Sequence, residues 1–536
     1  MSGISRRTLL RSTCAAMACG AAPAMLPQLN LLSAALASNS KGGGGYRALV
    51  CVYLDGGNDS WNLLIPGIAG EHAKYATARN DLYHRQTNPS GLAIPHWSGT
   101  GVVAGQTLPA SLPIASNQYA LNPFCPELQT LHNEGRLAFL SNVGTLVQPH
   151  VKARAGNLRP AQLYSHSDQT TQWQLGSSIS TTQAIGWGGQ LSGLVASLPT
   201  TTGLSPVITL AGQTRFLNGV APGGAPIVPF ALTTSNTAPA PQISNYAPSG
   251  TSANQVQAQR RAALEELIDL ANPQAFSREY QAVFDRSLFL AEQVINPAMA
   301  SIATNDPVNL PFEGLESHSF VSQLRQVARV IKVSTDPGLA NPINADRQIF
   351  FVRLGGFDTH SGQITSVNAT GHHLNLQRVS QAVHAFFRAM QAIGREIDVT
   401  LFSASEFGRT LNSNGDGTDH AWGAVQFVLG GAVNGGVYGR FPSMVLDNSL
   451  TGEVQDNPTQ GECYSRGQFI PTLAVDQVAA TLSRWMGLAD SELPTLFPNI
   501  DNFAPGAPYL QPSGVNSTPT FAYPGRIVPG LMAGVA

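Results

Sequence analysis

Charged residues are scarce in this 536-residue chain: Asp, Glu, Lys and Arg make up 12% of it, and the formal net charge is −2. Without a basic excess to follow a phosphate backbone, the composition argues against a nucleic acid partner. Beyond the N-terminal segment we find no apolar run long enough for a transmembrane helix. The 53 Gly and 36 Pro indicate many loops, in a chain long enough for one large domain or two.

Cysteine is also rare, with five in the whole chain. Cys14 and Cys19 belong to the N-terminal segment, and the remaining three contain no CxxC pair, which argues against a cysteine metal site. An oxidising compartment would allow one disulfide, for instance between Cys125 and Cys463. Cys51 lies in an apolar run and is expected in the core.

The N-terminus is typical of an export signal. Paired arginines stand in the context SRRTLL, an Ala-rich run follows, and residues 35–37 read ALA before a serine. This pattern predicts a twin-arginine signal over residues 1–37, use of the twin-arginine export machinery and a periplasmic or secreted protein. An N-terminal membrane anchor is the alternative, although Pro23 and Pro27 interrupt the apolar run.

Two nearly continuous apolar runs, at residues 47–54 and 347–354, are typical of parallel strands buried on both faces. Each is followed by a pair of glycines, which let the backbone turn sharply beside a ligand. Together with helical patterns between them, these runs indicate an α/β fold. Further strands are expected at 136–143, 398–403 and 424–429, and a helix is expected at 123–133. Amphipathic helices with core-facing stripes are expected at 255–271, 277–294, 320–332, 372–394 and 475–486.

Acidic residues and histidines gather where the predicted strands end. Asp358 and His360 are two residues apart, so their side chains point the same way in extended backbone. Asp419 and His420 repeat the combination in the polar loop after the strand at 398–403. Ligands of open α/β sheets bind at the carboxyl ends of strands. We therefore predict a metal site whose ligands come from Asp55, Asp59, Asp358, His360, Glu406, Asp419 and His420. For the segment after the strand at 47–54, the alternative is a turn in which Asp59 caps the next segment.

This ligand set mixes oxygen and nitrogen without thiolate. It suits one or two divalent ions, Zn²⁺, Mn²⁺, Mg²⁺ or Ca²⁺, and the histidines favour zinc or manganese. Such an ion polarises a phosphoryl or sulfuryl oxygen and activates a hydroxyl or water. Arg409 is expected to hold an anionic group, because the guanidinium fork fits two oxygens at once.

A second polar cluster, QLYSHSDQ at residues 162–169, places a serine, a histidine and an acid side by side. Ser165, next to His166, is a candidate nucleophile if a metal lowers the pKa of its hydroxyl. The equally weighted alternative is that Ser165 or Asp168 caps a helix through residues 170–175. We therefore take Ser165, His166 and Arg409 as the candidate catalytic residues.

The motifs LDGGNDSWN, YSHSDQ, GWGG, GGFDTH, SEFGRT and TDHAWG, with LGG, VYGR and the twin-arginine start, resemble the DUF1501 family of exported bacterial proteins. The resemblance extends from the signal to about residue 440. That family is grouped with the alkaline phosphatase and sulfatase superfamily. The resemblance therefore implies an alkaline phosphatase-like three-layer α/β/α sandwich with a mostly parallel central sheet, carrying inserted loops and helices.

The same resemblance implies roles by position. Asp55 corresponds to the acid after the first strand, Ser165 to the nucleophile, Asp358 and His360 to one metal pair, and His420 to the late histidine. The chain departs from the superfamily where Glu406-Phe407-Gly408 replaces Asp-His-Gly, since phenylalanine cannot bind a metal.

We therefore expect an exported, metal-dependent hydrolase-like protein acting on an anionic phosphate or sulfate ester. The alternatives are a catalytically degenerate member that binds a ligand or partner protein in the cell envelope, and a structural metalloprotein. The expected organisation is one domain at 46–505, with an insertion or cap at 190–345, followed by a Pro- and Gly-rich tail at 506–536.

Overall fold

The computed structural model describes residues 45–79, 92–103, 106–150, 158–177, 185–195, 204–236, 238–240, 255–270, 274–339, 341–364, 370–446, 462–504 and 525–535. The predicted signal at 1–37 lies outside the described residues, as do residues 506–524 and 536 of the predicted tail. In the part of the chain that the structure describes, no helix is both long and apolar enough to cross a membrane.

A nine-stranded, mostly parallel sheet forms the centre of the molecule. Only β14 runs antiparallel, to both of its neighbours, β13 and β7. The order across the sheet is β11 (Phe230–Ala231), β8 (Val207–Thr209), β12 (Arg347–Leu354), β1 (Arg47–Leu54), β13 (Val399–Ala404), β14 (Ala424–Gly430), β7 (Leu137–Gly144) and β15 (Gly436–Tyr438), and β18 (Leu473–Ala474) also pairs with β7.

The register of the central strands brings several loops to one edge of the sheet. Leu54 of β1 pairs with Leu354 of β12, so both strands end at the same level. Because β14 is antiparallel, it starts at the edge where β13 ends, and the loop 405–423 between them stays there. The turns after β1, β12 and β13 therefore meet, as the sequence predicted.

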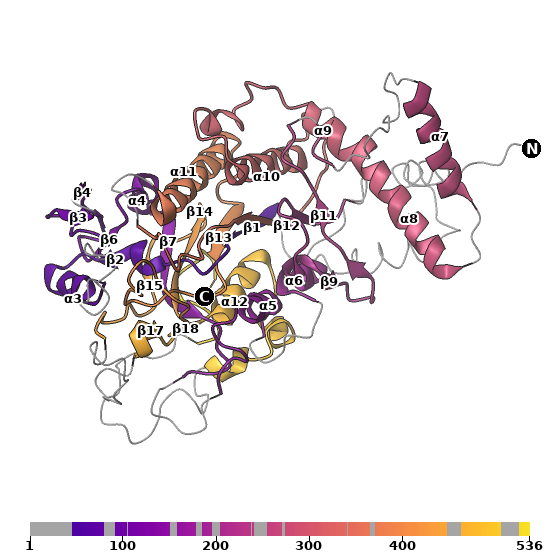
Figure 1. Ribbon diagram of the computed structural model, residues 1–536. Coiled ribbons are helices and arrows are strands. Elements are labelled where there is room, and N and C mark those ends of the chain that lie inside the picture. Colours follow the sequence, from indigo (N-terminus) through magenta and orange to yellow (C-terminus); the bar gives the residue numbers. More distant parts are fainter. Residues whose placement is uncertain are drawn as a thin grey trace, which may run out of the picture.

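Helices cover both faces of the sheet (Figure 1). One face packs α4 (Pro126–Asn133), α10 (Ser319–Thr335) and α11 (Gly371–Ala392), and the other packs α5 (His166–Leu175), α6 (Trp187–Val195), α12 (Val475–Met486) and α13 (Leu493–Leu496). Alternate residues of β1 serve the two faces: Val50 joins the first core cluster and Cys51 the second. The predicted three-layer α/β/α sandwich is confirmed.

Smaller elements surround these layers. The remaining strands are β2 (Leu64–Pro66), β3 (Gly101–Val103), β4 (Gln106–Leu108), β5 (Leu112–Ile114), β6 (Tyr119–Leu121), β9 (Gly219–Val220), β10 (Pro226–Ile227), β16 (Cys463–Tyr464) and β17 (Gln468–Phe469). The remaining helices are α3 (Ala69–Arg79), α7 (Gln255–Asp269), α8 (Ala275–Phe289), α9 (Asn296–Ala300), the π-helical turn η4 (Leu290–Ile295) and the 3₁₀ turns η1 (Ser60–Asn62), η3 (Arg215–Leu217), η5 (Leu310–Phe312), η6 (Ser465–Gly467), η7 (Asp490–Glu492) and η8 (Ile500–Phe503).

The segment 190–345, expected as an insertion or cap, is largely built into the central layers. Its strands β8 and β11 belong to the sheet, and its helix α10 packs on β12. Only the hairpin of α7 and α8 projects away from the sheet (Figure 1). The prediction that the stripe of α7 faces the core was wrong for Leu267 and Leu270, which are 59% and 52% exposed.

One further expectation differs from the structure. Cys125 and Cys463 form no disulfide: both are buried thiols, and their sulfurs contact the carbonyl oxygens of Leu376 and Val445. The described end of the predicted tail, residues 525–535, contributes to the core, because Leu531 is fully buried in the same core cluster as residues of α12.

Candidate metal centre

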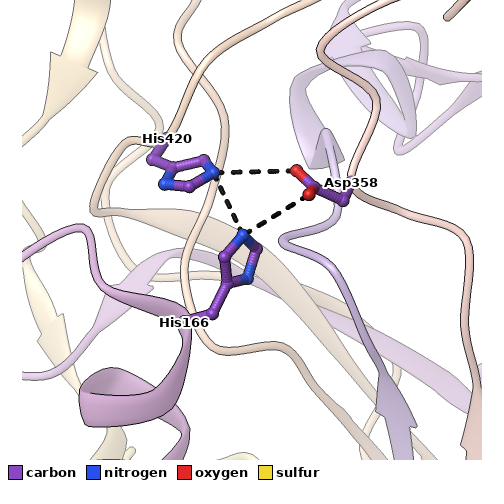
Figure 2. A group of neighbouring side chains, drawn as sticks. All are labelled: His166, Asp358 and His420. Atoms are coloured by element: carbon purple, nitrogen blue, oxygen red, sulfur yellow. Dashed lines mark hydrogen bonds and ion pairs between the residues drawn. The ribbon is translucent and has the colours of Figure 1, made fainter.

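Three side chains from distant parts of the chain meet at the carboxyl edge of the sheet (Figure 2). His166 opens α5, Asp358 follows β12, and His420 lies in the loop between β13 and β14. Their ligand atoms all lie within 4.8 Å of one another. Imidazole nitrogens and a carboxylate oxygen at such separations are a ligand set for a divalent cation.

The Nε2 atoms of three histidines converge on Asp358. His420 Nε2 lies 3.0 Å from His166 Nε2 and 2.8 Å from His360 Nε2. Asp358 Oδ1 is 3.6 Å from His420 Nε2 and 3.2 Å from His360 Nε2, while its Oδ2 is 3.7 Å from His166 Nε2. His360 therefore adjoins the group formed by the other three residues.

Each of these imidazoles is held at its other nitrogen by an oxygen acceptor. The Nδ1 atoms of His166 and His360 lie 2.7 Å from Glu406 Oε1 and 2.8 Å from Asp419 Oδ1, respectively. The Nδ1 of His420 lies 2.8 Å from the carbonyl oxygen of Tyr164. Metal-binding histidines characteristically donate their second N–H to a carboxylate or carbonyl, which fixes the tautomer and the ring orientation.

Both carboxylates are ionised at neutral pH and so act only as acceptors. Burial raises the pKa of Glu406, but hydrogen bonds from His166 and the Gly56 amide outweigh it and leave the pKa below its usual value. Burial also raises the pKa of Asp419, yet hydrogen bonds from Asn414, Arg466 and His360 bring it down to about 2. The Nδ1 atoms that face these oxygens must therefore carry the protons.

This arrangement leaves the converging Nε2 atoms as lone-pair acceptors when the rings are neutral. Burial lowers the pKa of His420, which favours its neutral form at neutral pH. Its single Nε2 then faces two other imidazole nitrogens and a carboxylate oxygen. One proton can bridge only one such contact, whereas a divalent cation satisfies all of these lone pairs together. The residues present fit a bound metal ion.

Arg409 is buried within the site and binds its backbone. It is fully buried, and it donates to the carbonyls of Gly57 at 2.9 Å, Thr418 at 2.7 Å and Gly56 at 2.6 Å. The same guanidinium pairs with Asp358. Arg409 thus fixes the turn after β1 and orients Asp358, which differs from the anion-binding place we predicted for it.

Ser165 caps α5. Its Oγ accepts from the Asp168 amide at 3.4 Å and donates to Asp168 Oδ2 at 2.6 Å. The capping interpretation is therefore confirmed, and it places His166 at the first helical position. The cap does not remove Ser165 as a nucleophile candidate, because the residue is only half-buried and adjoins His166 in sequence.

Four of the seven predicted metal residues lie outside the cluster of converging Nε2 atoms. Asp55 pairs with Arg353, and the fully buried Asp59 pairs with Arg79. Glu406 and Asp419 stand behind the histidines that they orient. Of the predicted set, Asp358, His360 and His420 meet, and they are joined by His166, which we predicted as catalytic.

Phe407 packs against two of the histidine rings, with centroid separations of 4.7 Å from His166 and 4.7 Å from His420. An aromatic ring at this position excludes water from one side of the cluster. Neither this contact nor the role of the Tyr164 carbonyl carries a sequence signal, because both depend on how α5 lies against the loop 405–423.

Residues 341–460 match the family described as "Protein of unknown function (DUF1501)". This range contains Asp358, His360 and His420. The predicted resemblance is confirmed over that range, and no sequence among the curated proteins matches the chain.

Solved structures that match the chain include the C-terminal periplasmic domain of EcEptC from Escherichia coli, at 11% identity and a TM-score of 0.29, covering 83% of this chain and 84% of that one. The PsFucS1 sulfatase from Pseudoalteromonas sp. matches at 12% identity and a TM-score of 0.28, covering 78% and 69%. The 2-O GAG sulfatase BT1596 matches at 10% identity and a TM-score of 0.29, covering 84% and 74%. TM-scores of this size leave the chemistry of the centre to be argued from this chain's own residues.

Proposed function

We propose that this chain is an exported, metal-dependent hydrolase of phosphate or sulfate esters, built around His166, Asp358 and His420 with His360 beside them. One observation carries the proposal: three imidazoles present their Nε2 atoms to one carboxylate, while an acceptor fixes each Nδ1. Histidines that serve only packing have no reason to converge in this way.

The metal type follows from the ligands. Imidazole nitrogen with a single carboxylate and no thiolate favours zinc or manganese over magnesium or calcium, which prefer oxygen. When bound, such an ion polarises a phosphoryl or sulfuryl oxygen and acidifies a hydroxyl or water.

The chain's own residues supply orientation and a nucleophile candidate. Arg409 holds Asp358, and Glu406 and Asp419 hold two of the histidines. Ser165 would form a bond to the phosphorus or sulfur of the ester, with Asp168 accepting the hydroxyl proton that it already binds at 2.6 Å; the bond to the ester's alcohol would break, and the alcohol would leave with a proton from water. A metal-activated water is the other nucleophile that this centre permits.

Export belongs to the same proposal. The pattern at residues 1–37 supports delivery by the twin-arginine machinery, which places the substrate in the cell envelope or outside the cell.

A second candidate is a degenerate member that binds a ligand in the envelope without turnover. The burial of Arg409 favours it, because this cation already donates to three backbone carbonyls and to Asp358 and is not exposed toward a substrate anion. Phe407, which lies against His166 and His420, favours it as well.

The deciding experiment measures the metal content of the purified chain by mass spectrometry, against an Asp358→Ala/His420→Ala variant. We expect one or two ions in the wild type and none in the variant. Glu406→Gln, which weakens the orientation of His166, should lower metal affinity about tenfold. His384→Ala is the matched control, because His384 lies on α11 and contacts Arg388 instead of the centre.

Activity separates the two candidates. A panel of phosphate and sulfate esters should be cleaved by the metal-loaded wild type and lost in Ser165→Ala; turnover that survives this change would assign the attack to water. Bound metal without any ester cleavage would favour the binding protein. A well-folded wild type that takes up no metal would refute both the centre and the hydrolase.

A further inference from the structure

Glu406, the carboxylate that orients His166, is itself held by donors on both of its oxygens. Its Oε1 lies 2.7 Å from His166 Nδ1 and accepts from the Gly56 amide at 2.9 Å. Its Oε2 lies 3.1 Å from the hydroxyl of Tyr53 and 3.2 Å from that of Ser405. The Glu406 side chain is 1% exposed, so these groups and not bulk water set the direction of the carboxylate.

Only one of the two hydroxyls is committed to Glu406. A hydroxyl carries a single proton, and the proton of Ser405 has a nearer acceptor in the Leu54 carbonyl oxygen, at 2.7 Å. The donor to Glu406 Oε2 is therefore Tyr53. Burial, followed by the charge of Glu406, raises the pKa of the Tyr53 hydroxyl, so it keeps its proton at neutral pH. Its removal would leave an ionised oxygen in the interior without its donor, which is costly.

The hydroxyl of Tyr53 also contacts helix α5. Its oxygen lies 2.7 Å from Thr170 Oγ1, and because the Tyr53 proton points to Glu406, Thr170 is the donor. Thr170 and His166 are four residues apart, which places them on the same face of the helix, about one turn from each other. Two neighbouring side chains of α5 are thus tied to one carboxylate, His166 directly and Thr170 through Tyr53.

Tyr53 and Glu406 come from neighbouring strands of the central sheet. Tyr53 pairs in register with Ala404 of β13, two residues before Glu406. The ring of Tyr53 also packs on that of Trp173 of α5, at a centroid separation of 5.3 Å. A displacement of α5 from the sheet must therefore break both of its hydrogen bonds to this network together.

We propose that Tyr53 and Thr170 are positioning residues that hold α5 and, with it, the ring of His166; the consequence for metal binding rests on the proposed function. Tyr53 acts through Glu406, and Thr170 acts through Tyr53. Hydrogen-bond partners behind a metal-binding histidine typically contribute roughly 10–100-fold to metal affinity. Loss of either hydroxyl should therefore weaken the centre without removing a ligand.

Zinc affinity, measured by competition with a chromophoric chelator, tests the role of each hydroxyl. Tyr53→Phe and Thr170→Val should each weaken zinc binding about tenfold, and Thr170→Ser, which keeps the donor, should bind as wild type does. Tyr46→Phe is the matched control, because the Tyr46 hydroxyl is also buried and donates to Gln348 Oε1 at 2.6 Å, beside the opposite end of β1. The zinc affinity of this control should not change.

Two outcomes of this measurement would overturn the proposal. Zinc affinity that falls equally in Tyr53→Phe and Tyr46→Phe would reflect a general loss of stability. Unchanged affinity in both Tyr53→Phe and Thr170→Val would show that neither hydroxyl positions the ligand, and it would leave the proposed function standing.

Hydrogen exchange of the metal-free protein tests the position of the helix without any ion. Amides of residues 166–175 should exchange faster in Tyr53→Phe and Thr170→Val than in wild type, and at the wild-type rate in Tyr46→Phe. A wild type that binds no zinc would refute the proposed function, and this exchange would then decide whether the two hydroxyls hold His166. Unchanged exchange in both variants would overturn the proposal.

Discussion

Asp476 is a carboxyl group buried in the core of this fold. It lies in the first turn of α12 at 1% exposure, and its Oδ2 has no hydrogen-bond partner among the described residues. Burial raises the pKa of its carboxyl to about 8, well above the usual value near 4. The folded protein therefore keeps this acid protonated at neutral pH.

The raised pKa predicts the pH dependence of stability. Between about pH 4 and 8 only the unfolded chain releases the proton, so this group lowers the free energy of unfolding by about 1.4 kcal/mol per pH unit as pH rises. Asp476→Asn removes that dependence. Urea unfolding of both proteins at pH 5 and 7.5 measures it. The stability of the variant relative to wild type should rise between these values; a constant difference would contradict the buried, protonated carboxyl.

At the scale of elements, the turn after β1 needs a glycine at position 57 to leave room for the ring of Phe407 beside the metal centre. Gly57 has a φ of +77°, and a Cβ there would overlap the ring of Phe407. That ring packs on His166 and His420. The ring of Phe407, in the loop after β13, therefore contacts both the turn after β1 and the first residue of α5.

Gly57→Ala should destabilise the protein by about 2–4 kcal/mol, combining backbone strain with overpacking against Phe407. Gly224→Ala is the matched control: Gly224 has a φ of +82°, and no described atom lies within 4 Å of the place its methyl group would take, so only the strain remains. Urea unfolding of both variants gives the comparison. Equal losses in the two variants would show that the contact with Phe407 contributes nothing.

The elements of the central layers could be predicted, because their periodic apolar patterns act locally. The strands at 47–54 and 347–354 and the helix at 475–486 have the predicted bounds. The sequence could not show which side chains the acidic residues after each strand would contact. Asp59 faces Arg79 and Asp55 faces Arg353, and both pairings depend on elements from elsewhere in the chain.

The site was predictable to the same extent. Asp358, His360 and His420 could be identified because acid and histidine recur beside strand ends. His166 was recognised as functional but not as a ligand, because its ring reaches the centre only through the way α5 packs. Amphipathic helices likewise could not show which of two apolar stripes faces the core, and in α7 the stripe with Leu267 and Leu270 faces outward.

Across the whole molecule, the candidate metal centre joins three regions that are far apart in the chain. Residues 166, 358 and 420 belong to a helix on one face of the sheet and to two loops at its edge. An ion that binds only the folded arrangement stabilises the entire fold by mass action.

Zinc should therefore raise the melting temperature of the chelator-treated protein. At a free zinc concentration about 1,000 times the dissociation constant, the added stability is about 4 kcal/mol. Differential scanning calorimetry of wild type and His420→Ala measures it, and the variant should not respond. A variant that is stabilised as much as wild type would place the bound ion elsewhere.

The position of β1 at the middle of the sheet has a consequence during synthesis. Arg47 pairs with Arg347, so this strand leaves the ribosome some 300 residues before its neighbour exists. At about 5–20 residues per second, that is a delay of roughly 15–60 s. For that time this apolar strand has neither of its sheet neighbours, β12 and β13, so its backbone hydrogen-bonding groups and both of its apolar faces stay uncovered until the second half of the chain has been made.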